Sequence, residues 1–272
     1  MTDISYHNHS RFSDGIDSIN DMVQAAKAAG LSEFGLSDHW VVAPFTDSEV
    51  KTWSMAHDQL DNYIQNVLQA RHDYSAGSFQ LRLGLEVDFF PENAAAVVAA
   101  LGDRPFDYLI GSVHYVERFS VDTSADTWAP LSQERIDDIW RQYWQRIRDL
   151  ARSGLYDIVG HLDLPKKFAF YPTVDLRVAE DAALAAIREA NMVIEINSAG
   201  MDKPCAEPYP SLSLLQRAGA LGIPVMVSAD AHRCANVKRN FPAAYDLMAR
   251  AGYDPDIRWS FKRRQRHAIR CA

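Results

Sequence analysis

Residues 6–15 read Tyr6-His7-Asn8-His9-Ser10-Arg11-Phe12-Ser13-Asp14-Gly15, and they follow a short extended run that begins at Asp3. Alternate side chains of a strand lie on the same side, so His7 and His9 are predicted to reach one metal ion. Asp14 lies in the turn that Gly15 closes and offers an oxygen ligand. A lone His-x-His pattern is more often structural, so the metal interpretation depends on similar residues elsewhere in the chain.

Strand-like and helix-like segments alternate through the rest of the chain. Apolar runs predict strands over residues 3–6, 33–37, 81–87, 107–113, 156–160, 192–197 and 224–229. Helical spacing predicts helices over residues 17–29, from Asp47 to about residue 68, and over 93–101, 132–153, 175–190, 211–221 and 242–251. Such alternation implies parallel strands with right-handed crossovers. We therefore expect an α/β fold whose strands, about seven in number, form one closed or nearly closed barrel.

Two segments lack this pattern. Residues 115–130 carry acidic and small polar residues and are expected to form a long loop over the end of the barrel. The basic run from Lys262 to His267 is expected to be a solvated surface. No repeat, linker or change in composition divides the 272 residues, so residues 1–272 are expected to form a single domain.

The composition is that of an ordinary soluble protein, with 47% hydrophobic and 24% charged residues. The net charge of −8 argues against binding to nucleic acid or to an anionic membrane. Cys205, Cys234 and Cys271 form no Cys-x-x-Cys pair, which suits a reducing cytosol. No signal peptide or apolar run of about 20 residues is evident. We expect a cytoplasmic monomer or small homo-oligomer.

Most of the histidines follow predicted strands. Six of the nine, together with three carboxylates, lie at or just after a strand end or in the first loop: His7, His9, Asp14, His39, Glu86, His114, His161, Asp230 and His232. Strand ends converge at the active-site face of a βα barrel. Clustered carboxylates repel one another, and metal ions remove that repulsion. The remaining histidines, at positions 57, 72 and 267, are interpreted as ordinary surface or packing residues.

These side chains offer nitrogen and oxygen ligands without a thiolate, which suits Zn, Mn or Fe and does not choose among them. Nine ligands are too many for one tetrahedral ion. They are enough for two or three divalent ions if one carboxylate bridges. Cys205 and Cys234 fit no cysteine motif and are interpreted as small buried residues.

Together these motifs resemble the polymerase-and-histidinol-phosphatase (PHP) superfamily, and within it the histidinol-phosphatase branch. The matching motifs of the superfamily are His7-x-His9, Ser13-Asp14-Gly15, Ser37-Asp38-His39, Gly84-Leu85-Glu86, Gly111-Ser112-Val113-His114, Gly160-His161-Leu162-Asp163, Glu195-Ile196-Asn197-Ser198-Ala199-Gly200 and Ser228-Ala229-Asp230-Ala231-His232. Those of the branch are Gly111 to Tyr115, His161 to Lys167 and Glu207 to Ser211. The resemblance implies a distorted (β/α)7 TIM-like barrel with a dinuclear or trinuclear metal site.

The resemblance also implies a ligand set. Its three metal positions would be held, in turn, by His7, His9, Glu86 and Asp230; by Glu86, His114 and His161; and by Asp14, His39 and His232. Asp38, Asp163 and Asn197 would orient imidazoles from behind.

The implied reaction is hydrolysis of a phosphate monoester. A metal-bridging hydroxide, held by Glu86, Asp230 and His232, would attack phosphorus in line. Substrate contacts are expected from Lys166, Lys203, Arg233 and Glu117: the three cations would face the phosphate, and Glu117 would face a substrate amine. The same loop also offers Asp122 and Asp126 for the amine.

We therefore expect a histidinol-phosphatase, a cytoplasmic enzyme of histidine biosynthesis whose partner is a small-molecule phosphate ester. An alternative keeps the chemistry and changes the substrate to another small phosphomonoester or a nucleotide. Two further alternatives are a non-catalytic PHP module, which need not keep every ligand, and a metal-dependent amidase, which usually needs a bridging lysine that no predicted strand end supplies.

Overall fold

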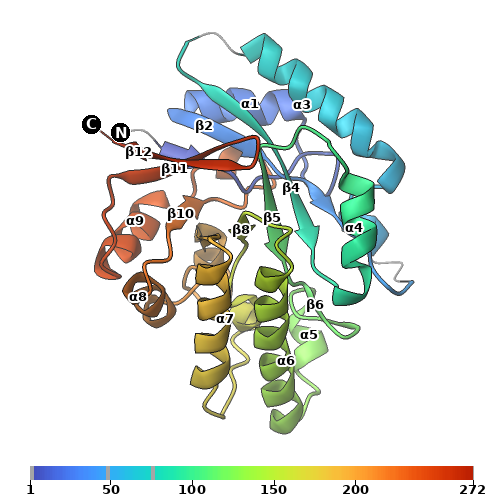
Figure 1. Ribbon diagram of the computed structural model, residues 1–272, viewed down its shortest axis with the longest axis vertical. Helices are drawn as coiled ribbons and strands as arrows, with labels where there is room; N and C mark the ends of the chain where they lie inside the picture. Colours follow the sequence, from blue (N-terminus) through green and yellow to red (C-terminus); the bar gives the residue numbers. More distant parts are fainter. Residues whose placement is uncertain (1–2, 47–49, 75–76, 272) are drawn as a thin grey trace.

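The strands of this protein form a nearly closed parallel barrel, seen in a computed structural model that describes residues 3–46, 50–74 and 77–271. Within these residues, the sheet runs in the order β1-β2-β4-β5-β8-β9-β10 (Figure 1). Its two ends meet at a parallel bridge between Asn8 and Ala231, where the His9 N–H donates to the Ala231 carbonyl at 2.8 Å. The α/β barrel predicted from the sequence is confirmed.

Most elements lie close to their predicted positions. The barrel strands are β1 (Asp3–Ser5), β2 (Leu31–Leu36), β4 (Gln80–Asp88), β5 (Tyr108–Ser112), β8 (Ile158–Val159), β9 (Val193–Asn197) and β10 (Val225–Ser228), and β3 (His39–Trp40) pairs with β4. The α-helices are α1 (Ile19–Ala28), α2 (Val50–Trp53), α3 (Leu60–Tyr74), α4 (Ala94–Leu101), α5 (Ala125–Trp128), α6 (Gln133–Arg152), α7 (Arg177–Glu189), α8 (Leu212–Ala220) and α9 (Phe241–Arg250). The 3₁₀ helices are η1 (His57–Gln59), η2 (Pro91–Asn93), η3 (Leu164–Phe168), η4 (Ser198–Asp202) and η5 (Cys234–Asn236).

Alternation along the strands decides what fills the barrel. Val193 of β9 and Met226 of β10 belong to the apolar cluster inside it. Further along β9, on the same face, come Glu195 and Asn197, which lie with the other polar side chains. The intervening Ile194 packs in the larger cluster between sheet and helices. Along β9 and β10 the inward-facing residues are therefore apolar at the start of the strand and polar at its end, as the period of two allows.

Tyr108 occupies the centre of the barrel. Its hydroxyl donates to the carbonyl of Tyr6 at 2.5 Å, and the two rings stack with centroids 4.8 Å apart. A Cβ atom at Gly35 or Gly84 would lie 2.1 Å from the Tyr108 side chain. These two glycines are needed because any larger residue would displace the tyrosine.

A β-hairpin made of β11 (Ile257–Lys262) and β12 (Gln265–Arg270) lies beside β1 (Figure 1). Phe261 is buried against Tyr6, with ring centroids 5.9 Å apart, and Arg264 forms an ion pair with Asp157. The basic side chains of this segment are exposed or half-buried, as expected. The hairpin itself was not predicted, because the charged run hides its alternating apolar residues.

The helix expected from Asp47 to about residue 68 is interrupted. Asp47 lies outside the described residues, and α2 and α3 are separate helices. Between them the Ser54 hydroxyl accepts from the Val41 N–H at 3.1 Å, and the Met55 N–H donates to the His39 carbonyl at 2.9 Å. These bonds draw the chain back to β3 and end α2.

The segment expected to be a loop over residues 115–130 contains short elements. β6 (Tyr115–Val116) pairs with β7 (Phe119–Ser120), and the Ser124 hydroxyl caps α5. Elements this short contain too few residues to show a hydrophobic period in the sequence. No helix within the described residues is long and apolar enough to span a bilayer.

Candidate metal centre

The nine predicted ligand residues come together at the carboxyl ends of the barrel strands. Their donor atoms form four overlapping groups in which all the atoms lie within 4.8 Å of one another. The groups are His7, His9 and Asp230; His7, Glu86 and His161; His39, Glu86 and His114; and His9, Asp14, His39 and His232. His57, by contrast, donates from Nε2 to the Val41 carbonyl at 2.8 Å and packs on Trp40.

Glu86 lies at the centre of this arrangement and is fully buried. Its Oε2 atom is 2.9 Å from Nε2 of His7 and 2.8 Å from Nδ1 of His39. Its Oε1 atom is 3.0 Å from Nε2 of His161 and 3.7 Å from Nε2 of His114. The two oxygens of one carboxylate thus face two different pairs of imidazoles, which is the geometry of a bridging ligand.

Two further carboxylates complete the arrangement. Asp230 Oδ1 lies 3.2 Å from Nε2 of His9. Asp14, nearer the surface, lies 3.2 Å from Nε2 of His232 and 3.7 Å from Nε2 of His39. Its position at the mouth follows from the turn between β1 and α1.

The donors fit divalent ions. Three of the facing atoms, Nε2 of His7, Nδ1 of His39 and Oε2 of Glu86, are buried without a hydrogen-bond partner. Zinc bonds of about 2.1 Å place neighbouring tetrahedral ligands roughly 3.4 Å apart. The separations around Glu86 run from 2.8 to 3.7 Å. The clusters therefore suit several divalent ions held by nitrogen and oxygen.

The protein's own carboxylates favour protons on several of these imidazoles, whereas burial and the neighbouring histidines lower the pKa of His9 to about 3. Burial lowers the pKa of His39, but Glu86 and Asp14 outweigh it and raise that pKa to about 9. Burial likewise lowers the pKa of His114, and Asp88 outweighs it and raises the pKa to about 10. Burial raises the pKa of Glu86, yet the surrounding histidines hold it well below its usual range. A metal ion entering the site therefore displaces protons.

Two carboxylates orient the imidazoles from behind, and neither was predicted to do so. Oε1 of Glu195 lies 2.8 Å from Nδ1 of His7, and Oδ1 of Asp88 lies 2.7 Å from Nδ1 of His114. Both contacts leave Nε2 of the ring directed at Glu86. Asp88 follows Glu86 by two residues on β4, so strand alternation could have found it.

Two of the residues predicted to orient imidazoles, Asp38 and Asp163, form hydrogen bonds or ion pairs with other groups instead. Asp38 accepts hydrogen bonds from the backbone and hydroxyl of both Ser10 and Ser13, at 2.7 to 3.0 Å. It therefore fixes the loop that carries Asp14. Asp163 pairs with Lys166 at 2.9 Å and accepts from the Ser211 N–H at 2.9 Å.

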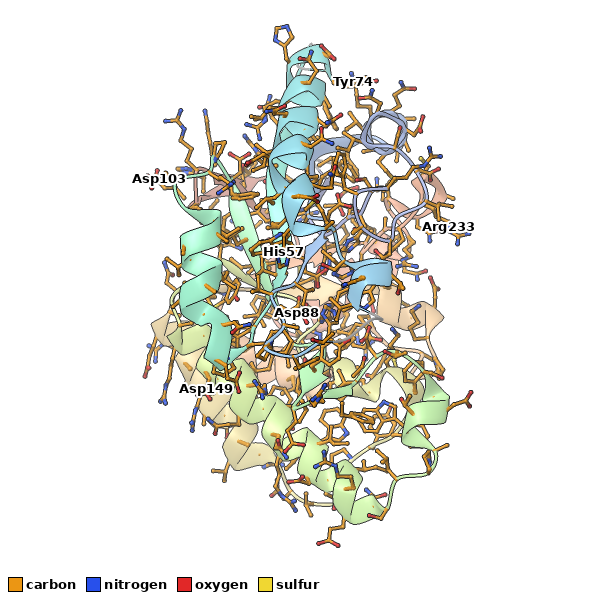
Figure 2. All side chains as sticks on the ribbon, turned by 90° about the vertical axis from the view of Figure 1, so that its right-hand side faces the viewer. His57, Tyr74, Asp88, Asp103, Asp149 and Arg233 are labelled. Carbon is orange, nitrogen blue, oxygen red and sulfur yellow. The ribbon has the colours of Figure 1, made fainter. Side chains whose placement is uncertain are left out.

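The cluster opens into a cavity of about 470 Å³. Besides the cluster's own side chains and Trp53, its walls carry four cations and one further carboxylate: Asp122, Lys167, Lys203, Arg233 and Arg239. Of the predicted substrate residues, Lys203 and Arg233 line this cavity, and Figure 2 shows Arg233 at the edge of the molecule with Asp88 nearer its middle.

The other two predicted substrate residues are placed elsewhere. Lys166 is only 2% exposed, and its ammonium lies 2.9 Å from Asp163 and 3.2 Å from Glu207. Glu117 is exposed and pairs with Arg135 at 2.9 Å. Neither lines the cavity. Their neighbours along the chain, Lys167 and Asp122, line it instead.

A model of the PHP domain family matches residues 5–199. The chain belongs to this family. A PHP relative from Deinococcus radiodurans, named "Probable histidinol-phosphatase", is 35% identical over 224 residues, which cover 82% of this chain and 84% of the relative. The "Histidinol-phosphatase" of Lactococcus lactis is 23% identical over 261 residues, 93% of each chain.

A crystal structure of histidinol phosphate phosphatase from Lactococcus lactis has the same PHP barrel. It matches with a TM-score of 0.80 at 22% identity, covering 98% of this chain and 99% of that one. That protein was crystallised with zinc, L-histidinol and phosphate. At this identity the likeness shows the fold.

Proposed function

We propose that this chain is a metal-dependent phosphomonoesterase that hydrolyses L-histidinol phosphate to L-histidinol and phosphate in histidine biosynthesis. The observation that carries the proposal is the shared carboxylate of Glu86, which faces two pairs of imidazoles at the base of a cation-lined cavity. The names of the relatives with which the chain aligns over most of its length support the substrate.

The metal positions would be held as the family resemblance implies. The first would use His7, His9, Glu86 and Asp230; the second Glu86, His114 and His161; and the third Asp14, His39 and His232. All of these residues belong to the four donor groups, although there His161 shares Glu86 with His7, and His114 shares it with His39. Nδ1 of His39 also lies 2.8 Å from Oε2 of Glu86, the oxygen that faces His7, so Glu86 contacts a residue assigned to the third position as well. When bound, divalent ions in such a cluster activate water for attack and neutralise charge on the phosphoryl group.

The wall of the cavity would bind the substrate's phosphate. Lys203 and Arg233 line it and are the cations we assign to the phosphate oxygens. Arg239 is already engaged, since its guanidinium donates to the carbonyls of Ala229 and Asp230 at 2.9 and 2.7 Å. We assign it to holding the loop that carries Asp230.

Asp122 would bind the substrate's ammonium group. It lines the cavity, and its Oδ2 lies 3.2 Å from Nζ of Lys167. Lys167 also donates to the Asp122 backbone carbonyl at 2.7 Å, which fixes the loop. Asp122 is the carboxylate of this wall that the three metal positions leave unused, so a cationic substrate has one complementary partner there.

The chain's organisation is proposed on the same basis. Residues 1–272 would form a single domain that acts in the cytoplasm as a monomer or small homo-oligomer, without nucleic acid. The continuous sheet that closes between Asn8 and Ala231 supports one domain.

Rates on two substrates test this function. Metal-loaded protein should hydrolyse L-histidinol phosphate with a higher kcat/KM than a nucleoside monophosphate, because only the former carries an ammonium for Asp122. A preference for the nucleotide would support phosphomonoester hydrolysis but contradict L-histidinol phosphate as the substrate. No hydrolysis of either by protein with a full metal content would favour a non-catalytic module.

A further inference from the structure

We propose that Glu195 is a positioning residue that couples two metal positions: it sets the tautomer of His7 and fixes the backbone of His161. This inference rests on the metal centre of the proposed function and not on its substrate. Glu195 is fully buried on β9 and belongs to none of the ligand groups. Its two oxygens nevertheless contact residues assigned to different positions.

The first contact is with an imidazole. Oε1 of Glu195 lies 2.8 Å from Nδ1 of His7, both atoms buried. A carboxylate only accepts hydrogen bonds, so Nδ1 of His7 must carry the proton. Nε2, 2.9 Å from Oε2 of Glu86, is then the nitrogen that a metal ion would bind, after displacing the proton that this second carboxylate favours. The charge of Glu195 also makes that nitrogen a stronger ligand.

The second contact is with a peptide group. Oε2 of Glu195 accepts from the His161 N–H at 2.9 Å. His161 has φ of 22°, a backbone conformation that residues other than glycine seldom adopt. Such a conformation persists only where its surroundings hold it. Glu195 supplies a charged hydrogen bond at that residue, and this aims the His161 ring at Oε1 of Glu86, 3.0 Å away.

A neighbouring amide extends the link. Nδ2 of Asn197 lies 3.2 Å from Oε2 of Glu195 and 3.0 Å from Oδ2 of Asp230. Asn197 therefore joins Glu195 to Asp230, which is assigned to the first position. It contacts Oδ2 of Asp230, while Oδ1 of Asp230 faces His9. One buried carboxylate thus orders ligands on both sides of Glu86.

Replacing Glu195 with glutamine separates the two roles. The His161 N–H needs an acceptor, so the amide oxygen of E195Q would face it. The amide NH₂ would then face Nδ1 of His7, which must become the acceptor, and the proton moves to Nε2. In E195Q the first metal position loses its ligand nitrogen while the second is kept.

The test uses full-length protein stripped with a chelator and reloaded with zinc. We expect E195Q to bind zinc at one position roughly 10–100-fold more weakly than the wild type, by competition with a chromophoric chelator. Asp88→Asn is the matched control, because it makes the same change behind His114 and should weaken the second position instead. E195A removes both contacts and should weaken both positions.

An NMR spectrum distinguishes control of the His7 tautomer from a general loss of structure at the metal centre. In zinc-loaded wild-type protein, the ¹H–¹⁵N spectrum should contain an Nδ1–H resonance assignable to His7, and E195Q should lack it. Absence of that resonance in the wild type overturns the proposal even if no variant folds. Wild-type zinc affinity in E195Q overturns the tautomer role, and equal losses in E195Q and E195A overturn the role at His161. Zinc binding as expected, but no hydrolysis of histidinol phosphate, would overturn the proposed substrate alone.

Discussion

Nε2 of His161 lies 3.0 Å from Oε1 of Glu86, although 75 residues separate them in the sequence. Their strands, β8 and β4, do not pair with each other, and β5 lies between them. Ser112, at the end of β5, donates to the same Glu86 oxygen at 2.6 Å. Three neighbouring strands therefore position one carboxylate, and the account of the site depends on it.

Glu86→Gln should remove most of the bound metal and nearly all turnover. An amide cannot bridge two ions as a carboxylate does, and each imidazole pair would lose a charged partner. Metal content after gel filtration and phosphate release measure the two effects. Near-normal activity with full metal content would contradict the bridging role.

His57→Ala provides the histidine control for that experiment. His57 contacts the Val41 carbonyl and the Trp40 ring and lies outside the ligand groups. Turnover per folded molecule should stay at the wild-type value, and the free energy of unfolding should fall by about 1 kcal/mol for the lost hydrogen bond. A large loss of turnover would mean that the histidines are divided wrongly between site and scaffold.

Metal uptake should release protons and strengthen with pH. Carboxylates raise the pKa of His39 to about 9 and that of His114 to about 10, so both rings are protonated at pH 7 before metal binds. Metal affinity should therefore rise as the pH rises toward about 9 to 10, where those protons are already lost. Calorimetric titration with zinc at pH 7, in buffers of different ionisation enthalpy, measures the protons released. No dependence on the buffer would contradict this protonation state.

Asp122→Asn should raise KM for L-histidinol phosphate roughly 10–100-fold, the effect of a lost charged hydrogen bond. The KM for an aryl phosphate, which has no ammonium, should change little. Steady-state kinetics on both substrates separate recognition from damage to the metal centre. A parallel change for both substrates would assign Asp122 to the loop's structure through Lys167.

Phe261→Ala should lower the free energy of unfolding by about 3–5 kcal/mol, because the ring is buried against Tyr6 and Tyr108. Turnover per folded molecule should be kept, since the hairpin is not part of the ligand clusters. Val178→Ala, at an 86% exposed position, is the control and should change neither quantity. Chemical denaturation measures both variants. An unchanged midpoint for Phe261→Ala would show that the hairpin does not stabilise the barrel.

The barrel could be predicted because each strand and helix carries its own period, and the clustering of the nine candidate ligands could be predicted because they follow strand ends. His39, His114 and His161 are examples: each follows a predicted strand within two residues, and the parallel sheet brings all three to one edge. The β11–β12 hairpin could not be predicted, because Arg263 and Arg264 at its turn gave the segment the composition of a solvated tail.

The charged residues that line the cavity were harder to predict than the candidate metal ligands. Lys166 and Lys167 are adjacent in η3, and nothing in the sequence says which one faces the cavity. The ion pairs that Lys166 makes with Asp163 and Glu207 decide it, and Glu207 is distant in sequence. Glu117 and Asp122 differ in the same way, since the β6–β7 turn directs only the second inward.

The most direct test is phosphate release from L-histidinol phosphate by protein stripped of metal and then reloaded separately with Zn, Mn and Fe. We expect no release without metal, fast release with at least one of these metals, and slow release from a generic aryl phosphate. Release that is slow with every metal on histidinol phosphate, but fast on another monoester, would contradict the proposed substrate. Undiminished release from the stripped protein would contradict the metal centre itself.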